Sequence, residues 1–154
     1  MGNEWIDPSG ERVAGVTIQN LTDSPIVALE DLLLQVPGFV LDGEDKALGE
    51  IAIVLTSDSH LAEMHGVHLG DPSVTDVMTF PYDDDSGSIS GDIVMSVERA
   101  MEQAEEEGWT IEDELLFIAI HGMLHLCGWD DRTEASRAAM HRRQHELLGE
   151  FRRG

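Results

Sequence analysis

The sequence predicts an α+β fold, in which a small mixed β-sheet of about four strands packs with about five helices. Two observations support this prediction. Apolar, β-branched segments of strand length alternate with helix-like segments along the first two thirds of the chain, and helical patterns fill the remainder. One helical segment, residues 110–126, is apolar on almost every side, which is typical of a helix buried at the centre of a domain.

The predicted elements of the N-terminal half follow from composition and from turn residues. Residues 13–20 and 48–55 are rich in Val, Ile and Leu, which favours strands. The Ser24-Pro25 pair is a typical helix start, with Ser as the N-cap and Pro at the first helical position. The Pro37-Gly38 pair predicts that this helix ends there.

A short helix is expected over 57–66, followed by strands over 74–80 and 92–95. The acidic segment 82–90 between these strands contains a glycine, so it suits a hairpin loop. Three helices are then expected, of which the first two are capped and stopped by local signals and the last is polar and runs over 133–148. The candidate caps and stops are Ser96, Gly108, Thr110 and Gly128, and Asp113 completes a sequence that resembles a capping box.

Length and composition indicate one folded domain. The chain has 154 residues, of which 42% are hydrophobic, and this suits a single domain over 1–154 with loose tails at 1–12 and 150–154. No stretch approaches the ~18 consecutive apolar residues of a membrane span. Residues 1–9 lack the cationic start and apolar run of a signal peptide. Cys127 is the only cysteine, so no internal disulfide can form, and a cytoplasmic protein is expected.

The net charge is strongly negative. Nine Lys and Arg are outnumbered by 31 Asp and Glu, which gives a formal charge of −22. Such a balance argues against a broad basic face for nucleic acid. Six of the eight arginines lie between residues 132 and 153, so the positive charge is concentrated near the C-terminus.

The segment that carries chemistry lies at the end of the buried helix, over residues 121–131, HGMLHLCGWDD. His121 and His125 are four residues apart, which places both imidazoles on one helix face, where two neutral rings can share a metal ion. The alternative is a pair of core histidines bonded to main-chain carbonyls. The helix is otherwise apolar, and two unpaired imidazoles would be costly to bury there, which favours the metal. Gly128 permits a sharp turn that can return Asp131 to the histidines as a third ligand. Three protein ligands leave one position open, which is the catalytic arrangement for Zn²⁺, with one ion per chain.

The same ligand spacing occurs in metalloproteases, which carry Glu directly after the first His as the general base. Here that position is Gly122. A protease built on this segment would therefore lack its proton acceptor.

Three blocks of sequence occur in a recognisable order. Residues 75–81 read TDVMTFP, residues 91–96 read GDIVMS, and residues 121–131 are the histidine segment. These blocks are similar to T-D-V-L-S-F-P, G-D-I-V-I-S and H-G-x-L-H-L-x-G-Y-D-H of the YbeY family, the bacterial rRNA maturation factors described as metal-dependent endoribonucleases. The resemblance runs from about residue 16 to residue 148, nearly the whole chain.

The resemblance implies a small mixed sheet with helices, and a zinc ion held by the three histidines of the family signature. The first two fall on His121 and His125, whereas the third falls on Asp131. A carboxylate is a harder, anionic ligand, so the site is expected to bind zinc less tightly or to admit other metals. Asp130 corresponds to the signature's own Asp. It is the nearest candidate for a general base or for a residue that orients a ligand, and it is the alternative third ligand if the loop shifts.

The arginine that many family members carry ahead of the first block, thought to contact RNA phosphate, is Leu69 here. His65 and His68 lie close by and are read more simply as surface histidines. Arg132 and Arg142 are the candidates for phosphate contacts, within a cluster that also includes Arg137 and Arg143. A solvated helix face paired with acidic residues is the alternative for this cluster.

Three further features have simpler readings. His141 and His145 repeat the four-residue spacing, but they lie on a polar helix without a third ligand and are expected at the surface. Cys127 is expected to be a small buried residue, with a thiolate ligand as the alternative. The acidic run 83–85 suits a solvated loop more than a site for a hard cation.

We therefore expect a zinc-dependent endoribonuclease that cuts single-stranded RNA in rRNA maturation and ribosome quality control, with RNA as substrate and ribosomal proteins as further candidate partners. One alternative is a non-catalytic ribosome-assembly factor with a structural metal, which Leu69 and the charge of −22 favour. The other is a metal-dependent hydrolase of a different substrate.

Overall fold

A mixed β-sheet forms one layer of the protein in the computed structural model, which describes residues 12–13, 15–22, 27–61, 63, 77–82 and 87–154. The sheet order is β1-β2-β3-β5-β4. Strands β2, β3 and β5 run parallel, whereas β1 and β4 pair antiparallel at the two edges. The strand bounds are β1 Arg12–Val13, β2 Val16–Asn20, β3 Leu48–Thr56, β4 Val77–Pro81 and β5 Ile89–Ser96. The predicted α+β class with a small mixed sheet is thus confirmed.

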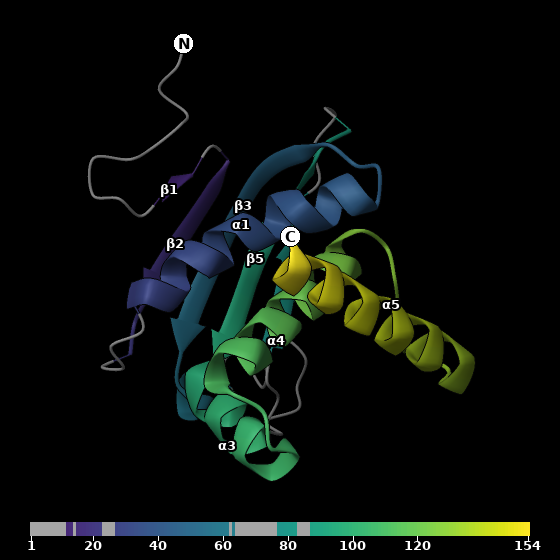
Figure 1. Ribbon diagram of the computed structural model, residues 1–154. Coiled ribbons are helices and arrows are strands. Elements are labelled where there is room, and N and C mark those ends of the chain that lie inside the picture. Colours follow the sequence, from purple (N-terminus) through teal and green to yellow (C-terminus); the bar gives the residue numbers. More distant parts are fainter. Residues whose placement is uncertain (1–11, 14, 23–26, 62, 64–76, 83–86) are drawn as a thin grey trace.

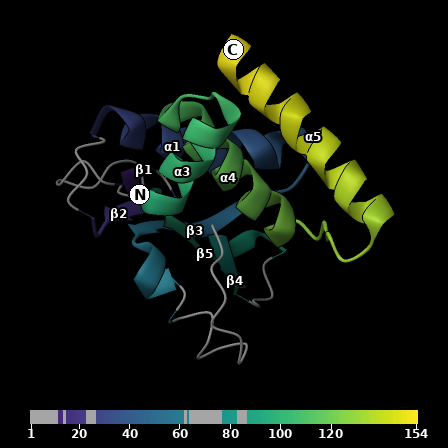
Figure 2. The same ribbon diagram turned by 90° about the horizontal axis from the view of Figure 1, so that it is seen from below.

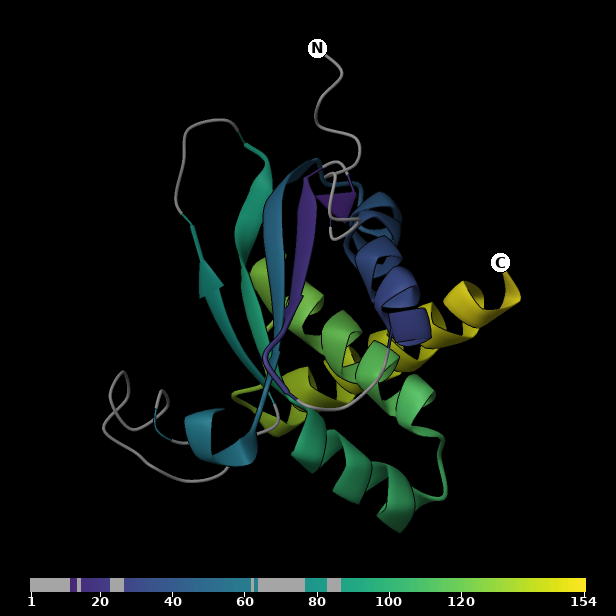
Figure 3. The same cartoon turned by 90° about the vertical axis from the view of Figure 1, so that its left-hand side faces the viewer.

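The long helices form a second layer. Helices α1, α4 and α5 lie on one side of the sheet (Figure 1 and Figure 3), and α4 lies between the sheet and α5 (Figure 2). The bounds are α1 Val27–Gly43, α3 Val97–Glu107, α4 Ile111–Leu126 and α5 Glu134–Arg153, and residues 58–61 form a further helical turn. No helix among these described residues is both long and apolar enough to cross a membrane.

The main core lies between the sheet and the helices. Alternate residues of β3, namely Ile51, Ile53 and Leu55, are at most 2% exposed and face this core. Helix α4 contributes side chains from nearly its whole circumference, as its apolar sequence predicts. A smaller cluster of Leu61, Met78 and Val94 is packed separately from the main core.

The local signals for helix ends are mostly confirmed. Ser96 Oγ accepts a hydrogen bond from the backbone N–H of residue 99 at 3.0 Å, and Gly108 ends α3 with a φ of 74°. Thr110 caps α4 by accepting from the backbone N–H of Asp113 at 3.1 Å. The carboxylate of Asp113 does not close a capping box, because it faces Arg152 Nε at 3.3 Å.

Helix α1 does not end at Pro37 as predicted, but continues to Gly43. A proline inside a helix costs about 3 kcal/mol, because it removes one hydrogen bond and crowds the preceding turn. Beyond it, however, Val40 and Leu41 are 0% and 1% exposed. Full burial of two such side chains contributes about 1.5–3 kcal/mol each, which offsets the cost of the proline.

Two other expectations about the chain ends and edges are corrected. The predicted strand 13–20 is broken at Gly15, whose φ is 78°, so that β1 turns back and pairs with β2. Residues 150–153 do not form a loose tail, because they continue α5 and place the Phe151 ring 5.2 Å from that of Phe39. The Ser24-Pro25 helix start, the end of the 57–66 helix, residues 65, 68 and 69, and the acidic run 83–85 lie outside the described residues.

Candidate metal centre

Two imidazoles and one carboxylate converge at the C-terminal end of α4. The Nε2 atoms of His121 and His125 lie 3.1 Å apart, and Asp131 Oδ2 lies 3.6 Å from the first and 3.4 Å from the second. All three ligand atoms lie within 4.8 Å of one another, so these three side chains could hold a metal ion, and we call them the metal group. The side chains are 26%, 26% and 41% exposed, which leaves the site open on one side to solvent. This is the grouping that the spacing of the sequence predicts.

The turn after α4 returns Asp131 to the histidines. Gly128 adopts a φ of 105°, a left-handed conformation that side chains disfavour. The Gly128 N–H donates to the carbonyl of His125 at 3.0 Å, and the Trp129 N–H donates to the carbonyl of Leu124 at 3.0 Å. These two bonds define a Schellman motif, which satisfies the last carbonyls of the helix and reverses the chain.

Each imidazole is oriented through its second nitrogen. His121 Nδ1 lies 3.1 Å from Gln144 Oε1, and His125 Nδ1 lies 3.0 Å from the carbonyl oxygen of Trp129. Gln144 Nε2 donates to the carbonyl of Phe117 at 2.9 Å, so its oxygen must face His121. Both oxygens can only accept, so each Nδ1 carries the proton and each Nε2 presents a lone pair. This tautomer is the one that a metal ion at the group requires.

A further layer of contacts fixes the loop that carries Trp129. Its indole Nε1 donates to Glu44 Oε1 at 2.8 Å, and Arg143 Nε donates to Glu44 Oε2 at 2.8 Å. The carboxylate of Glu44 is therefore held between the loop and α5, just after α1 ends. It is 12% exposed, and it raises the pKa of Arg143, so this guanidinium remains charged. Glu44, the loop at Trp129 and Arg143 of α5 thus together fix the carbonyl that faces His125 Nδ1.

Gly122 allows α4 to approach the sheet. A Cβ at this position would lie 2.9 Å from Ile93 Cγ2 on β5, which is closer than packed carbons tolerate. The glutamate that metalloproteases use as a base at this point would fit only if the Ile93 side chain or the helix shifted. The absence of Glu from position 122 therefore has a packing reason as well as a catalytic consequence.

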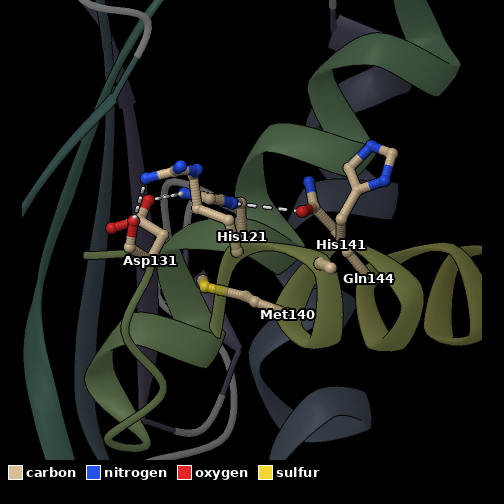
Figure 4. A pocket seen from close by; sticks show the side chains of 7 residues that line it. His121, Asp131, Met140, His141 and Gln144 are labelled. Carbon is tan, nitrogen blue, oxygen red and sulfur yellow. Dashed lines mark hydrogen bonds and ion pairs between the residues drawn. The ribbon is translucent and has the colours of Figure 1, made fainter. Parts of the chain in front are cut away.

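A cavity of about 380 Å³ opens beside the group, between α4 and α5. It is lined by His121, Asp131, Arg137, Met140, His141 and Gln144, among others. Figure 4 shows Asp131 and Gln144 on opposite sides of His121, with His141 beside Gln144 on the side away from Asp131. Arg137 also donates through Nη1 to the carbonyl of Asp131 at 3.2 Å. Two of the three ligand side chains, His121 and Asp131, thus line the same cavity as Arg137.

The structure does not bring Asp130 into the group. Its Oδ1 accepts from the backbone N–H of Arg132 at 3.1 Å, and its Oδ2 lies 3.5 Å from Arg132 Nη2. It lines a different cavity, together with Trp129 and Ser136. The hydrogen bond from the Arg132 backbone, with one from Ser136, lowers the pKa of the Asp130 carboxyl. These contacts favour a structural role in the turn before α5 over that of a proton acceptor.

The C-terminal arginines differ in what they face. Arg132 is 84% exposed and lies next to Asp130, and Arg142 is exposed outside the cavity beside the group. Arg143 is held by Glu44 and Glu146, so it is structural. Of this cluster, Arg137 is the member that lines the cavity beside His121.

The remaining histidine pair and the cysteine are not part of the group. His141 and His145 are exposed, as expected, and their rings lie 5.8 Å and 4.7 Å from Phe117. Partial burial and the neighbouring His141 lower the pKa of His145. Burial, reinforced by Glu44, raises the pKa of Cys127 to about 11, so its thiol stays protonated at neutral pH.

Sequence reasoning missed Gln144, and it placed His141 only at the surface. The signal that points to them is helical spacing, since Arg137, His141 and Gln144 are three or four residues apart and share one face of α5. That pattern shows which residues of α5 share a face, but not which face meets α4.

Comparisons with known proteins agree with this fold and this segment. The family model described as endoribonuclease YbeY matches residues 18–152. The endoribonuclease YbeY of Thermobifida fusca is 30% identical over 148 residues, covering 90% of this chain and 96% of that protein. That of Exiguobacterium sp. is 34% identical over 143 residues, covering 85% and 89%. The solution structure of TM1509 from Thermotoga maritima superposes with a TM-score of 0.60 at 27% identity, covering 88% of this chain and 89% of that one. The chain therefore belongs to the endoribonuclease YbeY family.

Proposed function

We propose that this chain is a zinc-dependent endoribonuclease that cuts single-stranded RNA during rRNA maturation and ribosome quality control in the cytoplasm. The observation that carries the proposal is the convergence of two Nε2 atoms and one carboxylate oxygen within 4.8 Å, at the wall of an open cavity. Membership of the family supports RNA as the substrate and cleavage as the reaction.

The donor set fits zinc. Two neutral imidazoles and one carboxylate are typical of catalytic zinc sites, which keep a further position for water or substrate. When bound there, such an ion supplies a Lewis acid and lowers the pKa of water toward neutrality. The hydrogen bonds from Nδ1 of His121 and His125 keep both rings in the ligating tautomer before any metal arrives.

The surrounding residues bind and orient the RNA. Arg137 lines the same cavity as Asp131, so its guanidinium can pair with a phosphate placed at the group. The chain carries a net charge of −22, so affinity for RNA depends on such local contacts rather than on a basic face. A ribosomal protein is the partner that we propose to supply the remaining affinity on the ribosome. Arg132 and Arg142 remain candidates for outer phosphate contacts.

The test measures cleavage and metal content on the same sample. Purified protein is incubated with a 5′-labelled single-stranded RNA and with its duplex, with and without a chelator, beside His121→Ala and Asp131→Ala. A matched control is His60→Ala, an exposed histidine outside the cavity beside the group. We expect cleavage of the single strand that is lost with chelator and in both site variants but kept in the control.

Other outcomes separate the alternatives. RNA left intact, with binding to ribosomes retained, would support a non-catalytic assembly factor. Purified protein that takes up no stoichiometric metal at neutral pH would contradict every catalytic version. Replacement by the family's ligand, Asp131→His, is expected to raise the preference for zinc over Mn²⁺, because imidazole is a softer ligand than carboxylate.

A further inference from the structure

A second cavity lies next to the one beside the metal group, where α3, α4 and α5 meet. It measures about 210 Å³ and is lined by Gln103, Glu107, Glu114, Phe117, Ile118, His121, His141 and Gln144. Three of these residues, His121, His141 and Gln144, also line the cavity that holds Asp131 and Arg137. The two cavities therefore adjoin, and we call them together the α4–α5 groove.

Aromatic rings line the end of the groove that is distant from Asp131. The rings of Phe117 and His141 lie 5.8 Å apart and are inclined at 88°, so they form two walls of a corner. Trp109 packs edge-on against Phe117 at 5.1 Å, and His145 lies 4.7 Å from the same ring. These contacts hold the Phe117 ring in place. A rigid aromatic corner that opens into a cavity is suited to a planar, stacking ligand.

The two ends of the groove differ in charge. Arg137 lies at the end that holds the metal group, whereas Glu107 and Glu114 line the end that holds Phe117. A phosphate is attracted to the first end and repelled from the second. The amino groups of a nucleobase, in contrast, can donate hydrogen bonds to carboxylates. The charge pattern thus orients a nucleotide unit with its phosphate at Arg137 and its base at Phe117.

The separation of the two ends suits one nucleotide. Phe117 and His121 are four residues apart on α4, which corresponds to about 6 Å along the helix axis. The distance from the phosphate to the base within a nucleotide is of this order. A base that is unstacked from its neighbours, as in single-stranded RNA, can therefore reach the aromatic corner while its phosphate contacts the group.

We propose that the α4–α5 groove is a nucleobase subsite, in which one base stacks on the His141 ring and meets the Phe117 ring edge-on, while the phosphate of the same nucleotide lies at Arg137 and the metal-ligand residues. This proposal rests on the proposed function, since it assigns the base next to the phosphate at the metal group. It also gives a reason for a preference for single strands, because a base held in a duplex cannot turn into the groove.

The test compares two small probes that share one phosphate. Adenosine 5′-monophosphate and ribose 5-phosphate are titrated by calorimetry into zinc-loaded protein, so that the difference in affinity reports the base alone. A stacked base contributes about 1–3 kcal/mol, so we expect the nucleotide to bind at least about fivefold tighter than the sugar phosphate. His141→Ala is expected to remove most of this advantage, and Phe117→Leu is expected to reduce it as well.

His141→Phe separates stacking from proton transfer. A phenyl ring stacks but does not titrate, so this variant is expected to restore the advantage of the nucleotide. His60→Ala is the matched control and is expected to keep it. His141 is exposed on α5, so its replacement leaves the core packing unchanged, which circular dichroism verifies. Equal affinity for the two probes in the unmodified protein, or an advantage that persists in His141→Ala, overturns the proposal.

Two further measurements identify the source of the nucleotide and test the subsite separately from the proposed function. A single-stranded oligoadenylate that binds more tightly than the free nucleotide identifies the occupant as an RNA strand, whereas equal binding contradicts the strand. If the protein cleaves RNA but binds the nucleotide no more tightly than the sugar phosphate, the subsite is refuted and the proposed endoribonuclease activity is not. If the nucleotide binds more tightly than the sugar phosphate and this difference depends on His141, but the protein cleaves no RNA, the endoribonuclease activity is refuted and the groove is a nucleotide-binding site.

Discussion

Replacement of Gln144 by Leu tests whether the imidazole of His121 is held ready for a metal. The Gln144 amide accepts from His121 Nδ1 at 3.1 Å and donates to the carbonyl of Phe117 at 2.9 Å. Leu has a similar size but no acceptor, so the His121 ring is free to rotate or to move its proton to Nε2. Loss of such a partner costs about 10–100-fold in metal affinity. Gln144 is only 4% exposed, so water cannot readily replace the amide, and we expect a loss of roughly 30-fold.

Gln144→Glu is the matched variant. Its carboxylate keeps an acceptor for His121, so the affinity for zinc is expected to stay within about threefold of the unmodified protein. It cannot donate to the Phe117 carbonyl when ionised, so the free energy of unfolding is expected to fall by about 1–3 kcal/mol. The affinity is measured by competition with a chromophoric chelator, and the stability by urea unfolding. Zinc binding by Gln144→Leu that is as tight as in the unmodified protein, or an equal loss of affinity in the two variants, would contradict this role of Gln144.

Three further predictions concern contacts around the site. Glu44→Ala leaves Trp129 and Arg143 without the carboxylate that they share, so it is expected to lower the free energy of unfolding by about 2–3 kcal/mol. Removal of the exposed Glu146 is expected to cost less than about 1 kcal/mol, and urea titrations of both variants check this difference. Gly122→Ala is expected to lower the free energy of unfolding by about 1–3 kcal/mol in the same urea titration, since the new methyl group meets Ile93 Cγ2 at 2.9 Å. A variant as stable as the parent would contradict the close packing. The pKa of His145 is lowered in the folded protein, so the folded state binds fewer protons than the unfolded state, and stability is expected to fall as the pH drops from about 6.5 through the folded pKa. The melting temperatures at pH 7.5 and pH 5 should therefore differ less in His145→Gln than in the parent.

Much of the backbone organisation could be predicted because its signals are local. The cap at Ser96, the left-handed Gly108 and the turn at Gly128 each depend on residues within one helical turn, and all three occur as predicted. The pairing of His121 with His125 is local for the same reason, since four residues of helix bring them to one face. The return of Asp131 needed only a glycine at the end of that helix.

The errors arose where a local signal competed with burial. Pro37 is a correct signal for a helix end in isolation, but the packing of Val40 and Leu41 against the core extends α1 past it. Residues 150–153 are polar on average, yet Phe151 against Phe39 holds them in α5. A stop signal worth a few kcal/mol is overridden when the residues beyond it bury comparable apolar area.

The sequence by itself determined the metal group, because all three ligands lie within eleven consecutive residues whose geometry is set by one helix and one turn. Only the tertiary structure decided what surrounds that group. Gln144, Glu44 and Arg137 come from other segments, and α5 has a mostly polar surface whose sequence does not reveal which side faces α4. The rotation of α5 about its own axis follows from the burial of a few side chains such as Met140 and Leu147, a balance summed over distant contacts. That rotation brings Arg137, His141 and Gln144 to the seam between α4 and α5.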